Sequence, residues 1–148
     1  MIETGAADAV PVRWDEATPA LMRSATNLET DQMKLLTKAN RQQLEANAAT
    51  SENAHLMPEV HIDHRPVVKL FDPAGAATWL LTEIEGDIAF GLCDLGMGSP
   101  ELGSVSINEL EAITGPLGIG IERDRYFEAE MTISQYAEAA RASGSIAA

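Results

Sequence analysis

The sequence lacks several features that define common classes of protein. Its one cysteine, Cys93, excludes an intramolecular disulfide and fits the reducing cytoplasm, where we expect the protein to reside. No apolar run approaches the length of a membrane span, so we expect no contact with a membrane. The first ten residues contain no basic start followed by an apolar block, and a secretory signal is therefore not expected.

Basic residues are scarce. The chain has 10 lysines and arginines against 23 aspartates and glutamates, which gives a net charge of −13. Residues 66–148 alone hold 13 acidic and 4 basic side chains, so the acidity belongs to the part that we expect to fold. Such a surface repels nucleic-acid phosphates and attracts basic protein surfaces. Solubility alone also accounts for this charge, and that alternative stays open.

The one basic cluster does not change this expectation. Lys34, Lys38 and Arg41 lie on one predicted helix and are typical of a solvated helix face. Since the net charge is strongly negative, we expect no direct binding of nucleic acid. The partner that the charge favours is a protein with a basic surface, and the oligomeric state stays open, a homodimer included.

Sequence patterns typical of cofactor and metal sites are also missing. The glycine loop at residues 96–100 lacks the lysine and the length of a phosphate-binding loop. His55, His61 and His64 lie in a segment that also holds Glu59 and Asp63, but their spacing matches no known metal site. We therefore expect neither a cofactor nor a metal, and we assign no catalytic residue.

The first part of the chain predicts little regular structure. Residues 1–27 are expected to form a loose lead with one short helix that begins at Thr18-Pro19. A firmer helix is predicted over residues 31–48, capped by Thr30, and residues 49–65 are predicted to form a loop. The helix presents a narrow apolar stripe that consists of Met33, Leu36, Leu44 and Ala48.

Residues 66–127 predict a sheet. Short turns such as Gly86-Asp87 join neighbouring apolar segments, and such short connections are typical of antiparallel strands. A helix at residues 107–114 is predicted to lead from the fourth strand to the fifth. The five predicted strands are residues 66–71, 78–85, 88–95, 102–106 and 119–127.

The third predicted strand has an informative alternation. Ile88, Phe90 and Leu92 point to one side, whereas Ala89, Gly91 and Cys93 point to the other. We interpret the large side chains as facing the core and the small ones as facing an element that packs closely.

Two helices carry clear end signals. Ser106 and Glu109 form a capping-box pattern at the start of the helix at 107–114, whose apolar stripe is Ile107, Leu110 and Ile113. Gly115 and Pro116 are expected to end that helix. A C-terminal helix is predicted over residues 133–143, between a hydroxyl cap at Thr132 or Ser134 and Gly144.

These elements together predict an α+β fold. We expect a curved antiparallel sheet of four to five strands with packed helices, in a single domain over residues 28–148 that follows the loose N-terminal lead.

The ordered motifs resemble a known family. The segments PVVKLF, DPAGA, LLTEIE, DIAFGLCDLGMG, PELG, the helix SxxELEA, GPLG and ERD follow one another as in the bacterial domain-of-unknown-function family 2958. The resemblance covers about residues 35–142 and leaves out residues 1–27. It implies a small cytoplasmic protein that is frequent on plasmids and other mobile elements. It transfers no catalytic residue to this chain.

The favoured function is therefore a non-enzymatic acidic interaction protein of a mobile genetic element. It would bind, and thereby inhibit, a basic host protein that handles nucleic acid, for example in defence. Carboxylates spaced like phosphates are needed to occupy a groove meant for DNA. The candidate binding residues are Glu83, Glu85, Asp87, Asp94, Glu101, Glu109 and Glu111.

A small enzyme is the alternative. Its reaction would use Cys93 or the cluster Glu122-Arg123-Asp124-Arg125 in a cleft. A cysteine nucleophile needs a base, and no histidine lies in the predicted sheet region. The charged cluster is also typical of a surface ion-pair ladder.

Overall fold

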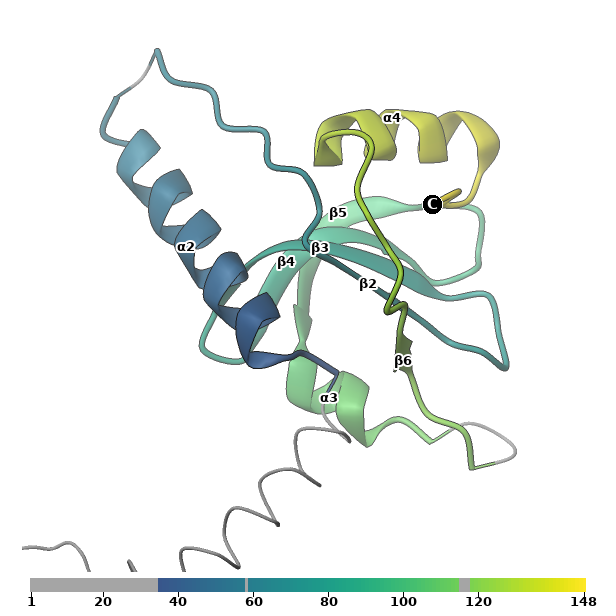
Figure 1. Cartoon of the computed structure of the whole chain (residues 1–148). Helices are drawn as coiled ribbons and strands as arrows, with labels where there is room; N and C mark the ends of the chain where they lie inside the picture. The colour runs from purple at the N-terminus through teal and green to yellow at the C-terminus, as the bar shows by residue number, and fades with distance from the viewer. Residues whose placement is uncertain (1–34, 58, 115–117) are drawn as a thin grey trace, which may run out of the picture. The chain divides into compact units, whose positions relative to one another are not determined.

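The structure is a computed structural model that describes residues 35–57, 59–114 and 118–148. Its centre is a five-stranded sheet with the order β5-β4-β3-β2-β6, in which every pairing is antiparallel (Figure 1). The predicted α+β fold with an antiparallel sheet is thereby confirmed. The strands are β2 (Val68–Phe71), β3 (Thr78–Glu85), β4 (Ile88–Asp94), β5 (Glu101–Ser106) and β6 (Glu122–Arg123).

Short turns and one helix connect the strands. Gly86, with φ of 60°, lies in the tight turn between β3 and β4, as the sequence predicts. Helix α3 (Ile107–Ala112) follows β5 directly, and the chain then returns to β6 at the opposite edge of the sheet. The predicted crossing from the fourth strand to the fifth is therefore correct.

The first face of the sheet packs against α2 (Lys38–Ala54) and α3. This face carries Val68, Leu81 and Ala89, and α3 adds Ile107 and Leu110 to the same core. Residues Leu35 and Leu36, which precede α2, are buried there as well. This larger core holds the sheet and the first two helices together.

The second face of the sheet packs against α4 (Ile133–Ser143). Leu80 of β3 and Leu92 of β4 are fully buried against Ile133 and Tyr136 of this helix. Figure 1 shows α4 crossing the sheet on the side away from α3. The core of the described chain is therefore divided by the sheet into two parts.

Helix α2 begins and ends later than the sequence predicts. Thr37 caps it, and the Thr37 hydroxyl and Asn40 amide bond to each other's backbone N–H groups at 3.0 and 3.1 Å. The helix continues to Ala54, into the predicted loop at 49–65. The predicted cap, Thr30, and Met33 of the stripe lie outside the described residues.

Polar contacts dock α2 more than its apolar stripe does. Leu44 is the one buried residue within the helix. Arg41 donates to the Gly86 carbonyl at 2.8 Å, and the Asn47 amide donates to the Thr82 carbonyl at 3.0 Å. The apolar pattern therefore places the end of this helix too early, because its last turns are held by hydrogen bonds such as that from Ser51 to Glu83.

The predicted orientation of the third strand, now β4, holds for its small residues, which pack closely, and for Leu92, but it is wrong for Ile88 and Phe90. The small residues Ala89 and Gly91 face the larger core, while Ile88 and Phe90 on the second face are 49% and 37% exposed. The physical reason is that α4 does not cover the whole of the second face. From Ile88 to Leu92, the residues that β4 presents to the second face are apolar, but α4 covers only the end of this face that carries Leu92.

A bulge in β3 decides which side chains reach each face. The register shifts between Leu81 and Glu83, so Thr82 is inserted without a partner in β4. Leu81 lies in the larger core, and the extra residue places Ile84 there as well. The bulge also moves Glu83 to the second face, opposite Phe90.

The start of α3 is as predicted, but a different carboxylate completes it. Ser106 is the N-cap and accepts from the Glu109 N–H at 3.1 Å. The Ser106 hydroxyl donates to Asp87, which also accepts from the Asn108 N–H at 2.7 Å. The helix ends at Ala112, so Ile113 is exposed, and the predicted stop at Gly115 and Pro116 lies outside the described residues.

The C-terminal helix confirms its predicted bounds. The Thr132 N–H donates to Gln135 at 2.9 Å at one end, and Gly144 adopts φ of 87° at the other. The preceding strand is much shorter than predicted, because only Glu122 and Arg123 pair with β2. The Tyr126 N–H then donates to the Asp124 carboxylate at 2.9 Å, which turns the chain away from the sheet.

Within the described ranges, no helix is long and apolar enough to cross a bilayer.

Candidate functional site

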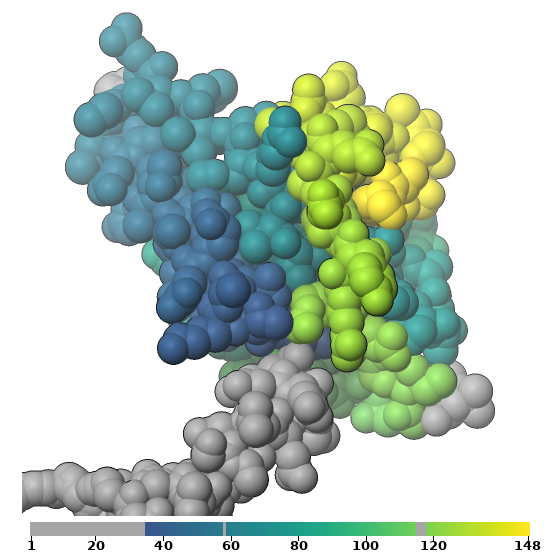
Figure 2. All heavy atoms as spheres, in the orientation of Figure 1, coloured from purple at the N-terminus to yellow at the C-terminus, as the bar shows by residue number. Residues whose placement is uncertain are grey.

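A groove of about 1010 Å³ lies on the part of the second face that α4 leaves uncovered. The C-terminal half of α2 and residues 60–62 form one wall, and β3, β4 and β5 form the floor and the other side. In the space-filling view α2 and the segment after it form one lobe beside the sheet (Figure 2).

The floor of the groove is apolar. Ile88 and Phe90 of β4 lie beside each other on the second face, and both are exposed. Val60 and Ile62 face the same space from the wall and are exposed too. A group of exposed apolar side chains within one concavity is typical of a site that a partner covers.

The polar side chains of the groove carry one sign of charge. Glu52 of α2 and Glu83 and Glu85 of β3 line it, and no lysine or arginine is among the described residues that do. His55 and His61 also line the groove. The arrangement is an apolar floor within an acidic rim, which suits a ligand that is both apolar and positively charged.

Ser51, His64 and Glu83 form a cluster at the wall of the groove. The Ser51 hydroxyl donates to the Glu83 carboxylate at 2.8 Å, and His64 Nε2 lies 3.0 Å from Ser51 Oγ. His64 Nε2 also lies 3.9 Å from Glu83 Oε2. The cluster joins α2, the segment after it and β3, and it exists because the bulge moves Glu83 to this face.

The hydrogen-bond network shows that Ser51 is not an activated nucleophile. Its single hydroxyl proton goes to Glu83, so Ser51 accepts a hydrogen bond from His64. His64 Nε2 is also 3.1 Å from the Asn47 carbonyl, which only accepts, so the network assigns the hydrogen to Nε2. A catalytic base would instead accept the hydroxyl proton. The cluster therefore serves to hold the wall.

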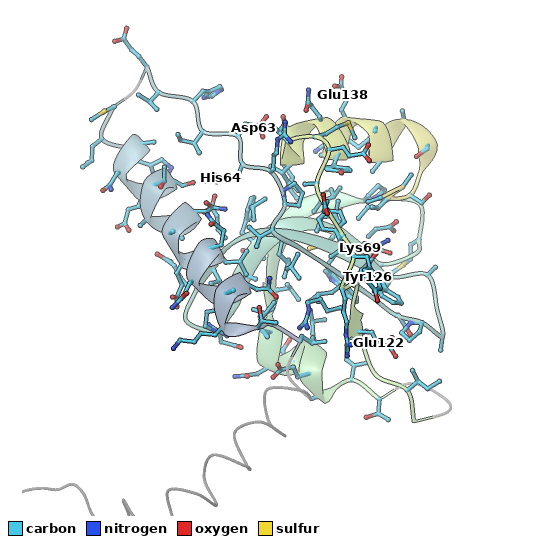
Figure 3. All side chains as sticks on the ribbon, viewed as in Figure 1. Asp63, His64, Lys69, Glu122, Tyr126 and Glu138 are labelled. Atoms are coloured by element: carbon cyan, nitrogen blue, oxygen red, sulfur yellow. The ribbon has the colours of Figure 1, made fainter. Side chains whose placement is uncertain are left out.

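Asp63, next to His64, fastens the same segment to α4. Its carboxylate accepts from the Ser134 N–H at 3.2 Å and from the Ser134 hydroxyl, at the start of the helix (Figure 3). Burial raises the pKa of Asp63, but hydrogen bonds from Ser134 and Thr132 and the charge of His61 together hold it below 3.8. The His64 carbonyl also accepts from the Ile133 N–H at 2.8 Å. Residues 63 and 64 therefore tie the groove wall to both helices.

Four of the seven predicted binding carboxylates have structural bonds. Glu83 belongs to the cluster with Ser51, and Glu111 accepts from the Leu35 N–H at 3.1 Å. Asp87 caps α3, and hydrogen bonds from Ser106 and Asn108 lower its pKa below 3.8. Asp94 is 2% exposed and accepts from the Gly96 and Ile146 N–H groups, which removes it from the set of binding residues.

The other three predicted carboxylates are exposed. Glu85 lines the groove, Glu101 begins β5, and Glu109 lies in the first turn of α3. Among the described ranges, these three side chains have no hydrogen bond or ion pair. They are therefore the members of the predicted set that remain available to a partner.

Cys93 lies half-buried on the first face of the sheet. Its sulfur is 4.0 Å from the Gly103 carbonyl, and burial raises the pKa of the thiol. A raised pKa lowers the fraction of thiolate at neutral pH. This environment gives the cysteine no activation as a nucleophile.

The predicted cluster at 122–125 has mainly structural contacts. Arg123 donates to the Leu35 carbonyl at 2.5 Å, and Asp124 lies 3.7 Å from the Lys69 ammonium. Lys69 and Tyr126, which are labelled in Figure 3, line a hollow of about 350 Å³. The pKa of Arg123 is lowered, first by desolvation and then by the charge of Arg125. The cluster fastens β6 to β2 and to the residues before α2.

The three histidines do not converge. His64 belongs to the cluster with Ser51, and His55 lies at the C-cap of α2. Within the described ranges, no group of three or more histidine, cysteine, aspartate or glutamate side chains is arranged to hold a metal ion.

Comparison with known proteins gives a family. The model of a family described as "Protein of unknown function (DUF2958)" matches residues 35–147, which is most of the chain. The chain belongs to the DUF2958 family. The predicted resemblance is thereby confirmed. No curated protein and no solved structure matches the chain.

The groove of this DUF2958 protein was not found by reasoning from the sequence. The sequence pattern predicts Ile88 and Phe90 in the core, and it predicts Ser51 and His64 in a loop. The alternation of β4 could have revealed a mostly apolar second face. Only the tertiary structure shows which end of that face α4 covers.

Proposed function

We propose that this DUF2958 protein is a non-enzymatic interaction protein that binds a basic surface of another protein. The observation that carries the proposal is the groove, which combines exposed Ile88 and Phe90 with the carboxylates of Glu52 and Glu85. Protein interfaces bury an apolar centre within a polar rim, and the groove has this composition. Complementary charge would steer a basic partner toward it.

The charge of the chain supports the class of partner that we propose. A protein surface that binds nucleic acid is basic, because it neutralises phosphates. An acidic protein of a plasmid or another mobile element that occupied such a surface would block it. We therefore propose a nucleic-acid-handling protein of the bacterial host, such as a defence protein, as the partner.

The enzyme alternative has less support. Ser51 donates its proton to a carboxylate, and burial raises the pKa of the Cys93 thiol, which lowers its thiolate fraction. Arg123 and Asp124 hold β6 in place. None of these groups combines a nucleophile, a base and an orienting group, which an active site for covalent catalysis needs.

Affinity capture from a bacterial host lysate tests the proposal. The bait is the full chain, in comparison with Glu52→Lys/Glu85→Lys at the rim and with Glu122→Lys/Glu138→Lys elsewhere. Glu122 lies on β6 and Glu138 on α4 (Figure 3), and both are exposed, so the two variants change the net charge equally.

We expect the wild type and the Glu122/Glu138 variant to capture the same basic protein at low salt, and the rim variant to lose it. Capture that both variants retain, or that both lose equally, would contradict the proposed site.

A further inference from the structure

Strand β5 presents an open edge. It is the last strand of the sheet, and within residues 35–57, 59–114 and 118–148 no strand or backbone hydrogen bond lies on its outer side. Natural edge strands are commonly protected by lysine, by proline or by a bulge. The sequence of β5, ELGSVS, contains neither residue, and its register with β4 is regular.

The register shows which backbone groups point outward. The Ile107 N–H donates to the Asp87 carbonyl at 2.9 Å, and Thr82 of β3 donates to the Phe90 carbonyl at 3.3 Å. The Asp87 carbonyl therefore faces β5, and the Phe90 carbonyl faces β3. Because the backbone groups of a strand alternate between its two neighbours, the N–H and C=O groups of Gly91 face β5 and bond with Gly103. The N–H and C=O groups of Leu102 and Ser104 therefore point away from the sheet.

The open edge borders the groove. Ser104 lines the groove and lies directly opposite Phe90 on the second face. In a strand added beside β5, the residue opposite Ser104 would point its side chain to this face. Two strand spacings, about 10 Å, separate it from Phe90, and the small Ser104 leaves room for a large apolar side chain to reach across.

The charges at the ends of β5 indicate what kind of strand can bind to its open edge. Exposed Glu101 lies at one end of β5 and exposed Glu109 follows the other end. A second copy of this chain would bring the same carboxylates and a net charge of −13, which opposes self-pairing. A strand with basic residues at its ends can pair with the carboxylates of Glu101 and Glu109. An apolar residue at its centre can contact the apolar floor of the groove.

We propose that the partner binds by adding an extended segment of this kind to β5 as a sixth strand of the sheet. This inference rests on the proposed function for the basic partner and adds the way in which it binds. Main-chain hydrogen bonds to Leu102 and Ser104 would supply affinity, and the groove and the two carboxylates would select the side chains.

Selection of displayed peptides on the full chain tests the proposal without knowledge of the partner. The probe is a library of random peptides of about nine residues, long enough to pair with the whole of β5. We expect selected peptides to carry lysine or arginine on both sides of an apolar residue. Selection of acidic peptides, or the absence of any binder, would contradict the proposal.

Methylation of single backbone nitrogens in the best peptide then tests the strand geometry. Every second methylation should weaken binding by about tenfold or more, because it removes a hydrogen bond to β5, and the intervening ones should have little effect. The amides of Leu102 and Ser104 should also become protected from hydrogen exchange. Methylation effects without this alternation would overturn strand addition.

A pair of protein variants gives an independent readout. Ser104→Pro removes the outward N–H of residue 104 and leaves the hydrogen bonds to β4 in place. Ser104→Ala keeps this N–H and is the control. We expect Ser104→Pro alone to lose the peptide at unchanged thermal stability. If Ser104→Pro still binds while Glu52→Lys/Glu85→Lys does not, the proposed function stands and strand addition is wrong.

Discussion

The two ends of one sheet face differ in what covers them. Leu92 and Phe90 are two residues apart on β4 and point to the same side, yet Leu92 is fully buried under α4 and Phe90 is 37% exposed. Both side chains are large and apolar, so the strand itself makes no distinction between them. The difference comes from the helix.

The length of α4 explains where the cover ends. An 11-residue helix is about 16 Å long, and its buried residues Ile133 and Tyr136 pack on the end of the face that carries Leu80 and Leu92. The other end keeps its apolar surface and gains carboxylates from β3 through the bulge. Apolar side chains thus serve stability at one end and, in our proposal, binding at the other.

Truncation of one side chain from each end is expected to give the largest difference. Leu92→Ala should lower the free energy of unfolding by about 2–5 kcal/mol, because it leaves a cavity under α4. Ile88→Ala should cost less than half of that, since the side chain is half-exposed. Urea denaturation of both variants measures the difference. Equal losses would show that the groove floor is part of the core.

Close packing of the first face gives the next largest effect. A Cβ atom at Gly91 would lie 1.9 Å from the Leu80 carbonyl oxygen, so Gly91→Ala should lower the free energy of unfolding by about 1–3 kcal/mol. Gly103 lies directly opposite and has open space around it, so Gly103→Ala is the matched control. A tolerated Gly91→Ala would mean that the bulge relaxes.

The N-cap of α3 supplies a smaller effect. Ser106→Ala removes the bonds to the Glu109 N–H and to Asp87, and it should lower the free energy of unfolding by about 0.5–2 kcal/mol. Ser104→Ala, on the same strand, should leave it nearly unchanged. An unchanged denaturation midpoint for Ser106→Ala would argue against the cap.

The anchor of the groove wall should show the smallest effect and a dependence on pH. Since the pKa of Asp63 is lowered in the folded state, its contribution is complete above the usual value of 3.8 and disappears as the pH falls through the folded pKa. Because Asp63 is exposed and solvent screens its charge, Asp63→Asn should cost only about 0.3–1 kcal/mol at neutral pH and nothing in strong acid. Glu138→Gln, on the exposed side of α4, is the control. If Asp63→Asn still lowers the free energy of unfolding in strong acid, the Asp63 carboxylate is not the anchor of the groove wall.

Local signals in the sequence were sufficient for much of the fold. Gly86 marks the turn between β3 and β4, and Thr132 and Gly144 mark the ends of α4. Each of these signals acts on neighbouring residues, through a turn or a cap. The sequence-based expectations for antiparallel neighbouring strands and for the start of α3 rested on the same kind of signal.

The groove could not be predicted from the sequence, because it depends on tertiary contacts. The bulge at Thr82 changes which face Glu83 and Ile84 occupy, and no apolar pattern shows an inserted residue. The last turns of α2 depend on Ser51, which bonds to Glu83 32 residues away in sequence. The acidic residues likewise divide into caps and exposed charges only when the fold brings them together.

The central claim is that the uncovered, acid-rimmed end of the second face binds a basic partner. The most direct test is the association rate with the captured partner, measured by stopped flow from about 0.05 to 0.5 M salt. We predict that the wild-type rate falls steeply with salt, since screening removes electrostatic steering. Glu52→Lys/Glu85→Lys should be slow at every salt concentration, and Glu122→Lys/Glu138→Lys should stay close to the wild type. Equal rates for the two variants, or a rate that salt does not change, would contradict the claim.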